Sequence, residues 1–422
     1  MSKQIHLWAF LQGIGHYPSG WRHADARPND VFSMDYYKSV GQLAERGRFD
    51  SIVFGDQLQS RGANGHTPER VAIPTLDPIA LLAAMGAVTD HIGLVATVST
   101  TYFEPAAVAE RFATLDRITG GRAGWNIVTT AHPASAWNFG QDEMPEKASR
   151  YARAHEFVNA ACALWDSADA DGNAVPVQYR GKHITMDAAM PGPVLPQGRP
   201  ILVQAGQSPD GRAFAAATAE AIFCPAPTKE DGIAFRNDMH ERIAAAGRDP
   251  EAVKIMPGLS FILADTEEAA IAKDEAILDL ADEALCIEYL GESIGFWLGG
   301  HDPKEPIPFD DILAGTEFPV ADITRMLEKP AASGIALGEF ASNHVRTPRG
   351  HTVFRGTPQQ LADRMIDWID SGACDGFTLQ PAYMPGELEI FVDEVVPLLQ
   401  KAGRLRLEYP GPTLRDTMGI AA

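Results

Sequence analysis

Short apolar runs rich in β-branched residues alternate with amphipathic segments along most of the chain. The first two runs, Ile5–Phe10 and Ser51–Gly55, are predicted strands with the helical pattern Tyr36–Arg48 between them. Six further predicted strands are Ile92–Val98, Ala123–Val128, Pro200–Ala205, Ala221–Phe223, Ile255–Ala264 and Phe377–Gln380. Strands that alternate with helices pair in parallel, and eight of them can close a barrel. The pattern favours an α/β fold of the (β/α)8 TIM-barrel type, although an open doubly wound sheet has the same periodicity.

Two stretches interrupt this alternation. A polar loop rich in Gly, Asp and Pro, at about 165–198, follows the helical pattern Lys147–Trp165. Residues from about 290 to 355 are rich in Gly, Pro and aromatic residues and fit neither a strand nor a helix well. Long irregular segments inside a compact fold are usually functional. We therefore expect one barrel domain over residues 1–422 with two insertions, the second serving as a lid over the C-terminal mouth of the barrel.

Composition and charge narrow the possible partners. With 45% apolar and 22% charged residues, the 422-residue chain has the composition of an ordinary globular protein. Its formal net charge of −21 disfavours nucleic acid and anionic membranes as partners. The N-terminal apolar run does not have the form of a signal peptide, and the longest apolar stretch, Ile79–Val88, is half a membrane span. These features predict a cytoplasmic protein.

Four common catalytic or nucleotide-binding motifs are absent from the sequence. It contains no HExxH motif, P-loop, GxSxG elbow or dinucleotide-binding GxGxxG, so metal hydrolysis and nucleotide triphosphate chemistry lack support, and we expect no metal site. The four cysteines are too widely spaced for a zinc knuckle or a disulfide framework. We expect them to be buried, reduced thiols: Cys162, Cys224, Cys286 and Cys374.

Polar residues instead gather where predicted strands end, which is where barrel enzymes place their sites. Asp56 follows a strand, where a carboxylate can hold a ring N–H or cap the next segment. Thr97 ends another strand and precedes three more hydroxyl residues, which is also compatible with a structural role. Asn126 lies in an otherwise apolar strand, and its amide needs partners from the backbone or from a ligand.

A second group of residues has the properties of an anion site. Lys147 and Tyr151 are four residues apart at the start of a helical pattern and therefore share a face. The run QAGQS, ending at Ser208, leads from a strand into a helix whose free N–H groups can bind a phosphate. Ser208 also has the position of an ordinary N-cap. Together these residues indicate a phosphate-bearing ligand that contains a ring. Five histidines lie in segments that can face the mouth: His16, His23, His132, His155 and His344.

The run GGRAGWNIVTT, from Gly120 to Thr130, carries a resemblance. With RFATLD before it and WNFG after it, this run resembles the nitrilotriacetate/pristinamycin/dibenzothiophene-sulfone monooxygenase family of bacterial-luciferase-like flavin monooxygenases. Further matches are ERGRFD (45–50), Arg150-Tyr151 with Glu156-Phe157, QAGQS (204–208), DGF (375–377) and LRD (414–416). These motifs occur in order and span nearly the whole chain.

The resemblance implies a luciferase-like barrel with a two-component chemistry. A separate NAD(P)H:FMN reductase would supply reduced FMN (FMNH2), and its reaction with O2 would give a C4a-(hydro)peroxyflavin that oxygenates a small organic substrate. A homodimer or higher homo-oligomer is also implied. The 165–198 loop is shorter than in relatives, so the resemblance does not transfer a substrate.

The family pattern also assigns roles to single residues. It places flavin contacts at Asp56, Thr97, Tyr151 and Ser208, with Asn126 in the wall of the site. Lys147 stands where relatives often have histidine, and an ammonium group can still donate to phosphate. As candidate catalytic residues we take His16, on the substrate side where it would hydrogen-bond the peroxide, and His344.

Two alternative functions use the same barrel. An F420-dependent oxidoreductase would transfer hydride without oxygen, and a flavin-binding protein without turnover would serve as a reservoir or sensor. The motif around Trp125 and Asn126 favours FMN over F420, whereas the polar residues alone do not separate binding from catalysis.

Overall fold

Eight parallel strands form a closed barrel in the computed structural model of the chain. In barrel order they are β1 (His6–Leu11), β2 (Ser51–Phe54), β3 (Gly93–Ser99), β4 (Ala123–Val128), β7 (Ile201–Gln204), β8 (Ala221–Cys224), β9 (Lys254–Leu263) and β11 (Gly376–Leu379). Each strand pairs in parallel with the next, and β11 pairs back with β1. The predicted (β/α)8 barrel is confirmed, and the open sheet is excluded.

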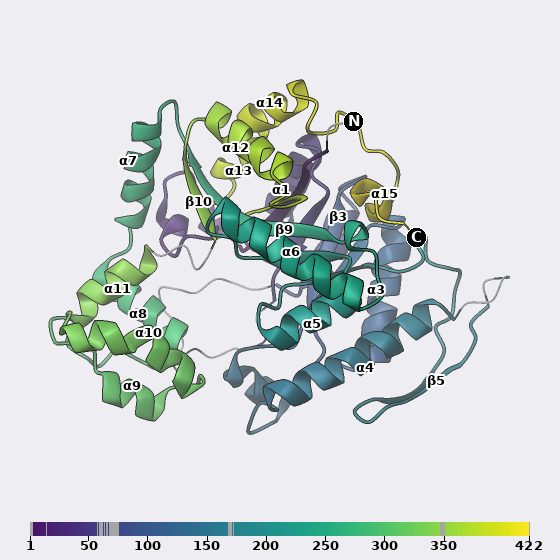
Figure 1. The fold of residues 1–422 in the computed structure, drawn as a ribbon, viewed down its shortest axis with the longest axis horizontal. Coiled ribbons are helices and arrows are strands. Elements are labelled where there is room, and N and C mark those ends of the chain that lie inside the picture. The colour runs from purple at the N-terminus through teal and green to yellow at the C-terminus, as the bar shows by residue number, and fades with distance from the viewer. Residues whose placement is uncertain are drawn as a thin grey trace.

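Helices cover the outside of the barrel, as Figure 1 shows for α3 to α6. They are α1 (Met34–Arg46), α2 (Pro78–Gly86), α3 (Pro105–Thr119), α4 (Lys147–Trp165), α5 (Pro209–Thr218), α6 (Lys229–Ala245), α7 (Glu267–Leu278), α12 (Pro358–Asp370), α13 (Gly386–Ile390) and α14 (Val396–Lys401). The structure describes residues 3–13, 15–56, 76–167, 173–346 and 351–421, together with residues 58, 62, 64, 66 and 171.

Strand β4 shows how the alternation of side chains builds the two sides of the barrel wall. Trp125 points outward, where its ring centroid lies 5.6 Å from that of Phe112 on α3 and 5.8 Å from that of Phe157 on α4. Its indole N–H donates to the carbonyl oxygen of Val98 at 3.0 Å. Successive side chains of a strand point to opposite faces, so Asn126 points into the barrel.

The two insertions are more regular than the sequence indicates. The 165–198 segment contains an antiparallel hairpin, β5 (Val177–Arg180) and β6 (Thr185–Ala188). The expectation that 290–355 is irregular is wrong, because this region holds helices that form a group at the left of Figure 1: α8 (Glu283–Ile294), α9 (Phe309–Gly315), α10 (Val320–Ser333) and α11 (Leu337–Val345). A further strand, β10 (Thr352–Gly356), pairs with β9.

This helical group, residues 283–345, has its own apolar core, which includes Leu290, Leu327 and Leu337. The helical pattern was obscured because α10 contains Pro330 and because glycines in the left-handed region end α8 at Gly295 and α10 at Gly334. Proline and glycine are ordinarily the signals of a loop. The structure does not test the expected role of the group as a lid.

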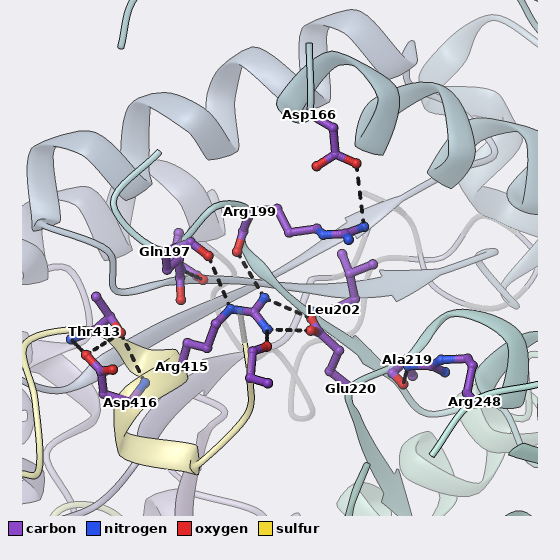
Figure 2. Close-up of polar contacts among 12 residues, drawn as sticks. Asp166, Gln197, Arg199, Leu202, Ala219, Glu220, Arg248, Thr413, Arg415 and Asp416 are labelled. Atoms are coloured by element: carbon purple, nitrogen blue, oxygen red, sulfur yellow. Dashed lines mark hydrogen bonds and ion pairs between the residues drawn. The ribbon is translucent and has the colours of Figure 1, made fainter. Parts of the chain in front are cut away.

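The N-terminal end of the barrel is closed by α15 (Leu414–Met418), near the C-terminus in Figure 1. Leu414, Met418 and Ile420 pack among inward-facing residues of the strands. A Cβ atom at Gly93 would lie 2.4 Å from a methyl carbon of Leu414, so only glycine fits at the start of β3. On the same helix, Arg415 hydrogen-bonds to Glu220 and to neighbouring carbonyl groups, as Figure 2 shows.

The remaining sequence expectations concern membranes and cysteines. Among the described residues, none of the helices combines the length and the apolar character that a membrane span requires. All four cysteines are free thiols, and three of them are buried. Cys162 differs from the expectation because it is only half-buried, although burial still raises the pKa of its thiol to about 11.

Candidate functional site

A cavity of about 340 Å³, which we call the first cavity, opens at the C-terminal ends of β2, β3, β4 and β7. This is the end of the barrel where enzymes of this fold carry their sites, and the volume falls in the usual range for small ligands, about 300–1,000 Å³. Its lining residues are Asp56, Leu58, Thr97, Val128, Thr129, Thr130, Ala131, His132, Tyr151, Gln204, Ala205 and Gly206. Three of the six predicted cofactor residues, Asp56, Thr97 and Tyr151, therefore share one cavity.

Thr97 and Asn126 lie side by side because the register of β3 and β4 pairs them. The Asn126 amide nitrogen donates to the Thr97 hydroxyl oxygen at 2.9 Å, while its carbonyl oxygen is buried and has no hydrogen-bond partner in the described part of the chain. Because the amide occupies an acceptor position of the Thr97 oxygen, the hydroxyl proton can serve a ligand. Asn126 thus positions Thr97 and adds an unpaired acceptor beside the first cavity.

Tyr151 and Ser208 converge on the N-terminus of α5. The Ser208 hydroxyl oxygen accepts the Gly211 N–H at 3.2 Å, which confirms the N-cap that the sequence predicted. A Cβ atom at Gly211 would lie 2.9 Å from the Tyr151 hydroxyl oxygen and 2.8 Å from the backbone of Gly206. The helix terminus therefore approaches both the lining loop and the tyrosine. Two hydroxyl groups and the positive end of the helix dipole meet there, an arrangement suited to an anion.

Lys147 is less well placed than Tyr151. It is the first residue of α4, one turn before Tyr151, but its side chain is exposed and does not line the first cavity. Contact between its ammonium group and a phosphate remains a prediction.

The loop after β4 forms one wall of the first cavity, and hydroxyl groups hold it in place. Thr130 has φ 53°, in the left-handed region that a β-branched residue rarely adopts. The hydroxyl groups of Ser99 and Thr130 are 2.7 Å apart and share a hydrogen bond, and the Thr101 hydroxyl donates to the carbonyl oxygen of Thr129 at 2.8 Å. Ser99 and Thr101 thus have structural roles, which the sequence had left open for the hydroxyl residues after Thr97.

A second cavity, of about 170 Å³, occupies the other half of the mouth, beside β1, β8, β9 and β11. Its lining combines these strand ends with residues of the helical group: Phe10, Gln12, His16, Tyr17, Pro18, Phe223, Ser260, Leu278, Tyr289, Val345, Arg346, His351, Val353 and Gln380. Most of these residues were not singled out in the sequence. Gln12 and Gln380 directly follow strands, so the strand-end rule that located Asp56 could have found them.

The two candidate catalytic histidines lie in different surroundings. His16 lines the second cavity, and its Nε2 lies 2.9 Å from the carbonyl oxygen of Phe10. A carbonyl oxygen only accepts, so Nε2 carries the proton and Nδ1 is an acceptor in the neutral ring. His344 belongs to α11 and packs between Tyr289 and Phe340. Its ring lines neither cavity, and burial lowers its pKa, so it is neutral at pH 7.

Metal chemistry finds no support in the described part of the chain, where no three His, Cys, Asp or Glu side chains come together as metal ligands. The polar groups around the first cavity are hydroxyls, amides, one carboxylate and the imidazole of His132, and these suit an organic ligand that carries hydrogen-bond donors and acceptors.

Comparisons with known proteins agree with this architecture. Residues 14–374 match the sequence model of the luciferase-like monooxygenase family. N-acetyl-S-(2-succino)cysteine monooxygenase from Bacillus subtilis (strain 168) is 38% identical over 99% of this chain and 97% of its own. Nitrilotriacetate monooxygenase component A from Aminobacter aminovorans is 37% identical over 100% and 97%. The structure of riboflavin lyase (RcaE) with modified FMN and riboflavin has a TM-score of 0.83 and 26% identity, covering 99% of this chain and 96% of the other.

Proposed function

Because the chain belongs to the luciferase-like monooxygenase family of flavin-dependent enzymes, we propose that it is the oxygenating component of a two-component FMN-dependent monooxygenase. The observation that carries this proposal is the convergence of Asp56, Thr97 and Tyr151 on one cavity beside the α5 N-terminus. A separate NAD(P)H:FMN reductase would supply the reduced flavin. The name of the nitrilotriacetate relative, component A, supports a second component of this kind.

The first cavity fits a flavin on several grounds. The hydroxyls of Tyr151 and Ser208, with the N–H groups of the α5 N-terminus, would hold the phosphate, and Lys147 would add its charge. Asp56 and Thr97 would contact the ring system and the ribityl chain, and the unpaired carbonyl oxygen of Asn126 would meet a ligand donor. Bound reduced FMN would supply the oxygen chemistry through a C4a-(hydro)peroxyflavin, while the protein orients it and excludes water.

The second cavity would hold the small organic substrate. It adjoins the same mouth, and His16, which lines this cavity, would hydrogen-bond the oxygen donor there. We further propose that residues 1–422 form one barrel domain and that the helical group covers the mouth as a lid. Val345 and Arg346 of this region line the second cavity together with Phe10 and Phe223 of the barrel. His344 would act only indirectly, through Val345. We also propose a homodimer or higher homo-oligomer.

The experiment is an anaerobic titration of the wild type and of Tyr151→Phe/Ser208→Ala with reduced FMN. The double variant loses two hydroxyl donors to phosphate, worth about 1.5–3 kcal/mol each, so its affinity should fall by at least a factor of ten. Reduced riboflavin, which lacks the phosphate, should bind both proteins equally. Equal affinity of both proteins for reduced FMN would show that the hydroxyls of Tyr151 and Ser208 do not hold the phosphate.

A further inference from the structure

We propose that His132 is a flavin-binding residue that hydrogen-bonds the riboflavin portion of FMN. This inference rests on the proposed function, because it assigns the flavin to the first cavity. His132 lies in the loop after β4, where it lines that cavity with Thr97 and Tyr151. It is not among the positions that the family pattern assigns to the cofactor.

The histidine ring is held in place from two sides. Its backbone follows Thr130, which Ser99 fixes through the 2.7 Å hydroxyl contact, and precedes a short 3-10 helix (Pro133–Phe139). The ring meets Phe318 of the helical group edge-on, with 5.2 Å between ring centroids and an interplanar angle of 74°. A ring positioned in this way is preorganised to bind, because little side-chain freedom remains to be lost.

Both ring nitrogens of His132 are buried and have no hydrogen-bond partner among the residues that the structure describes. Burial also lowers the pKa of the ring, so it is neutral at pH 7 and offers one N–H donor and one acceptor nitrogen. Buried polar groups in proteins are nearly always paired, and a group left unpaired at a cavity wall is explained when a ligand completes it.

The chemistry of a neutral imidazole selects between the parts of FMN. A phosphate dianion offers only acceptors and favours charged or multiple donors. The ribityl hydroxyls and the imide edge of the flavin ring present donors and acceptors together. This combination matches the one N–H donor and the one acceptor nitrogen of the neutral His132 ring. The phosphate already has Tyr151, Ser208 and the helix terminus. His132 therefore contacts the riboflavin portion.

The test compares His132→Phe and His132→Leu with the wild type in anaerobic titrations with reduced FMN and reduced riboflavin, followed by tryptophan fluorescence. We expect the dissociation constants of both ligands to rise by the same factor, about 3- to 10-fold, in both variants. Because the leucine side chain is shorter than that of histidine and reaches less far into the cavity, a loss in His132→Leu is not caused by obstruction. The flavin-free variants should unfold at the same urea concentration as the wild type or a higher one, since an unpaired polar ring has been replaced by an apolar side chain.

The matched control is His155→Phe. His155 also packs edge-on against a phenylalanine, Phe214, at 4.8 Å, and burial lowers its pKa as well, but it lines neither cavity. Its substitution should leave both affinities unchanged. Three results would overturn the proposal: unchanged affinities in the His132 variants, a loss confined to reduced FMN, or a drop in the urea midpoint of the flavin-free protein. If the wild type bound no flavin, the proposed function itself would fail.

Discussion

The two ends of the barrel differ in how their polar groups are satisfied. At the N-terminal end, the guanidinium of Arg415 donates to both carboxylate oxygens of Glu220 and to the carbonyl oxygens of Gln197, Arg199 and Ala421 (Figure 2). At the C-terminal end, Asn126 and His132 have buried polar atoms beside a cavity, and none of the described residues hydrogen-bonds to these atoms. One end is completed by the chain itself, and the other offers unpaired groups to a ligand.

Residues that carry the family resemblance also lie at the N-terminal end of the barrel, away from the proposed binding site. In the GGRAGWNIVTT run, Arg122 is buried and donates to the carbonyl oxygens of Gly86, Thr89 and Ile92. Asp50, which ends the ERGRFD run, binds His6 and Arg406 at 2.7 Å each. Both residues precede strands and belong to the closed end. Many positions that carry the resemblance therefore stabilise the barrel, whereas the loops at the mouth determine what it binds.

The largest effect should come from removing the charge at the closed end. Arg415→Met leaves the carboxylate of Glu220 largely buried without its cation, which should cost about 3–5 kcal/mol of unfolding free energy in urea. The affinity of the folded protein for reduced FMN should not change. Arg325→Met is the control, because Arg325 is 77% exposed and pairs with Asp322 on its own helix. Comparable losses of unfolding free energy in Arg415→Met and Arg325→Met would show that the buried ion pair at the N-terminal end contributes no more than an exposed one.

The N-terminal end of the barrel also contains a carboxyl group, that of Asp116, whose pKa is raised by burial. Burial raises the pKa of Asp116 to about 6, although its Oδ1 accepts from the Gln197 side chain at 2.6 Å. Its Oδ2 has no hydrogen-bond partner among the described residues. Between about pH 4 and 6 the folded protein keeps a proton that the unfolded chain releases, so this group lowers stability as the pH rises. The full effect is up to about 3 kcal/mol for a shift of about two units.

The test is the free energy of unfolding of Asp116→Asn relative to the wild type. The difference should move in favour of the variant by that amount as the pH rises from about 4 to 7, whatever constant cost the amide adds. A difference that does not depend on pH would show that Asp116 titrates normally in the folded protein.

The smallest effect separates capping from binding. Ser208→Ala and Thr357→Ala each remove an N-cap hydroxyl, and each should cost about 1 kcal/mol of stability. Ser208 caps α5 beside the first cavity, whereas Thr357 caps α12 and lines neither cavity. Only Ser208→Ala should also weaken the binding of reduced FMN, because only this hydroxyl lies at the proposed phosphate site. If both variants bind as the wild type does, Ser208 is a cap and nothing more.

The sequence predicted the barrel well because its strands are short, apolar and regularly spaced. All eight expected strands exist, and the helix Lys147–Trp165 has the bounds expected from its pattern. The helical group escaped prediction because Pro330 lies inside α10 and because glycines end α8 and α10, so that the segment has the composition of a loop. A tertiary core overrides such local signals.

The candidate site was predictable only in part. Asp56, Thr97 and Tyr151 meet because the strand ends and the starts of the helices that follow them gather at one mouth, which is a property of the fold. The exposure of Lys147, the packing of His344 among aromatic rings and the two unpaired nitrogens of His132 depend on side-chain orientation. The loop that carries His132 depends on Thr130 in the left-handed region, a conformation that its residue type does not indicate.

The most direct test of the central claim starts from the anaerobic complex of the protein and reduced FMN. This complex is mixed rapidly with oxygenated buffer, and the absorbance of the flavin is followed over time. We expect a transient band of an oxygenated flavin that decays more slowly than free reduced flavin oxidises, because the mouth excludes water. Reduced F420, titrated in parallel, should bind far more weakly than reduced FMN. Immediate appearance of oxidised FMN without an intermediate, or preferential binding of F420, would contradict the monooxygenase account.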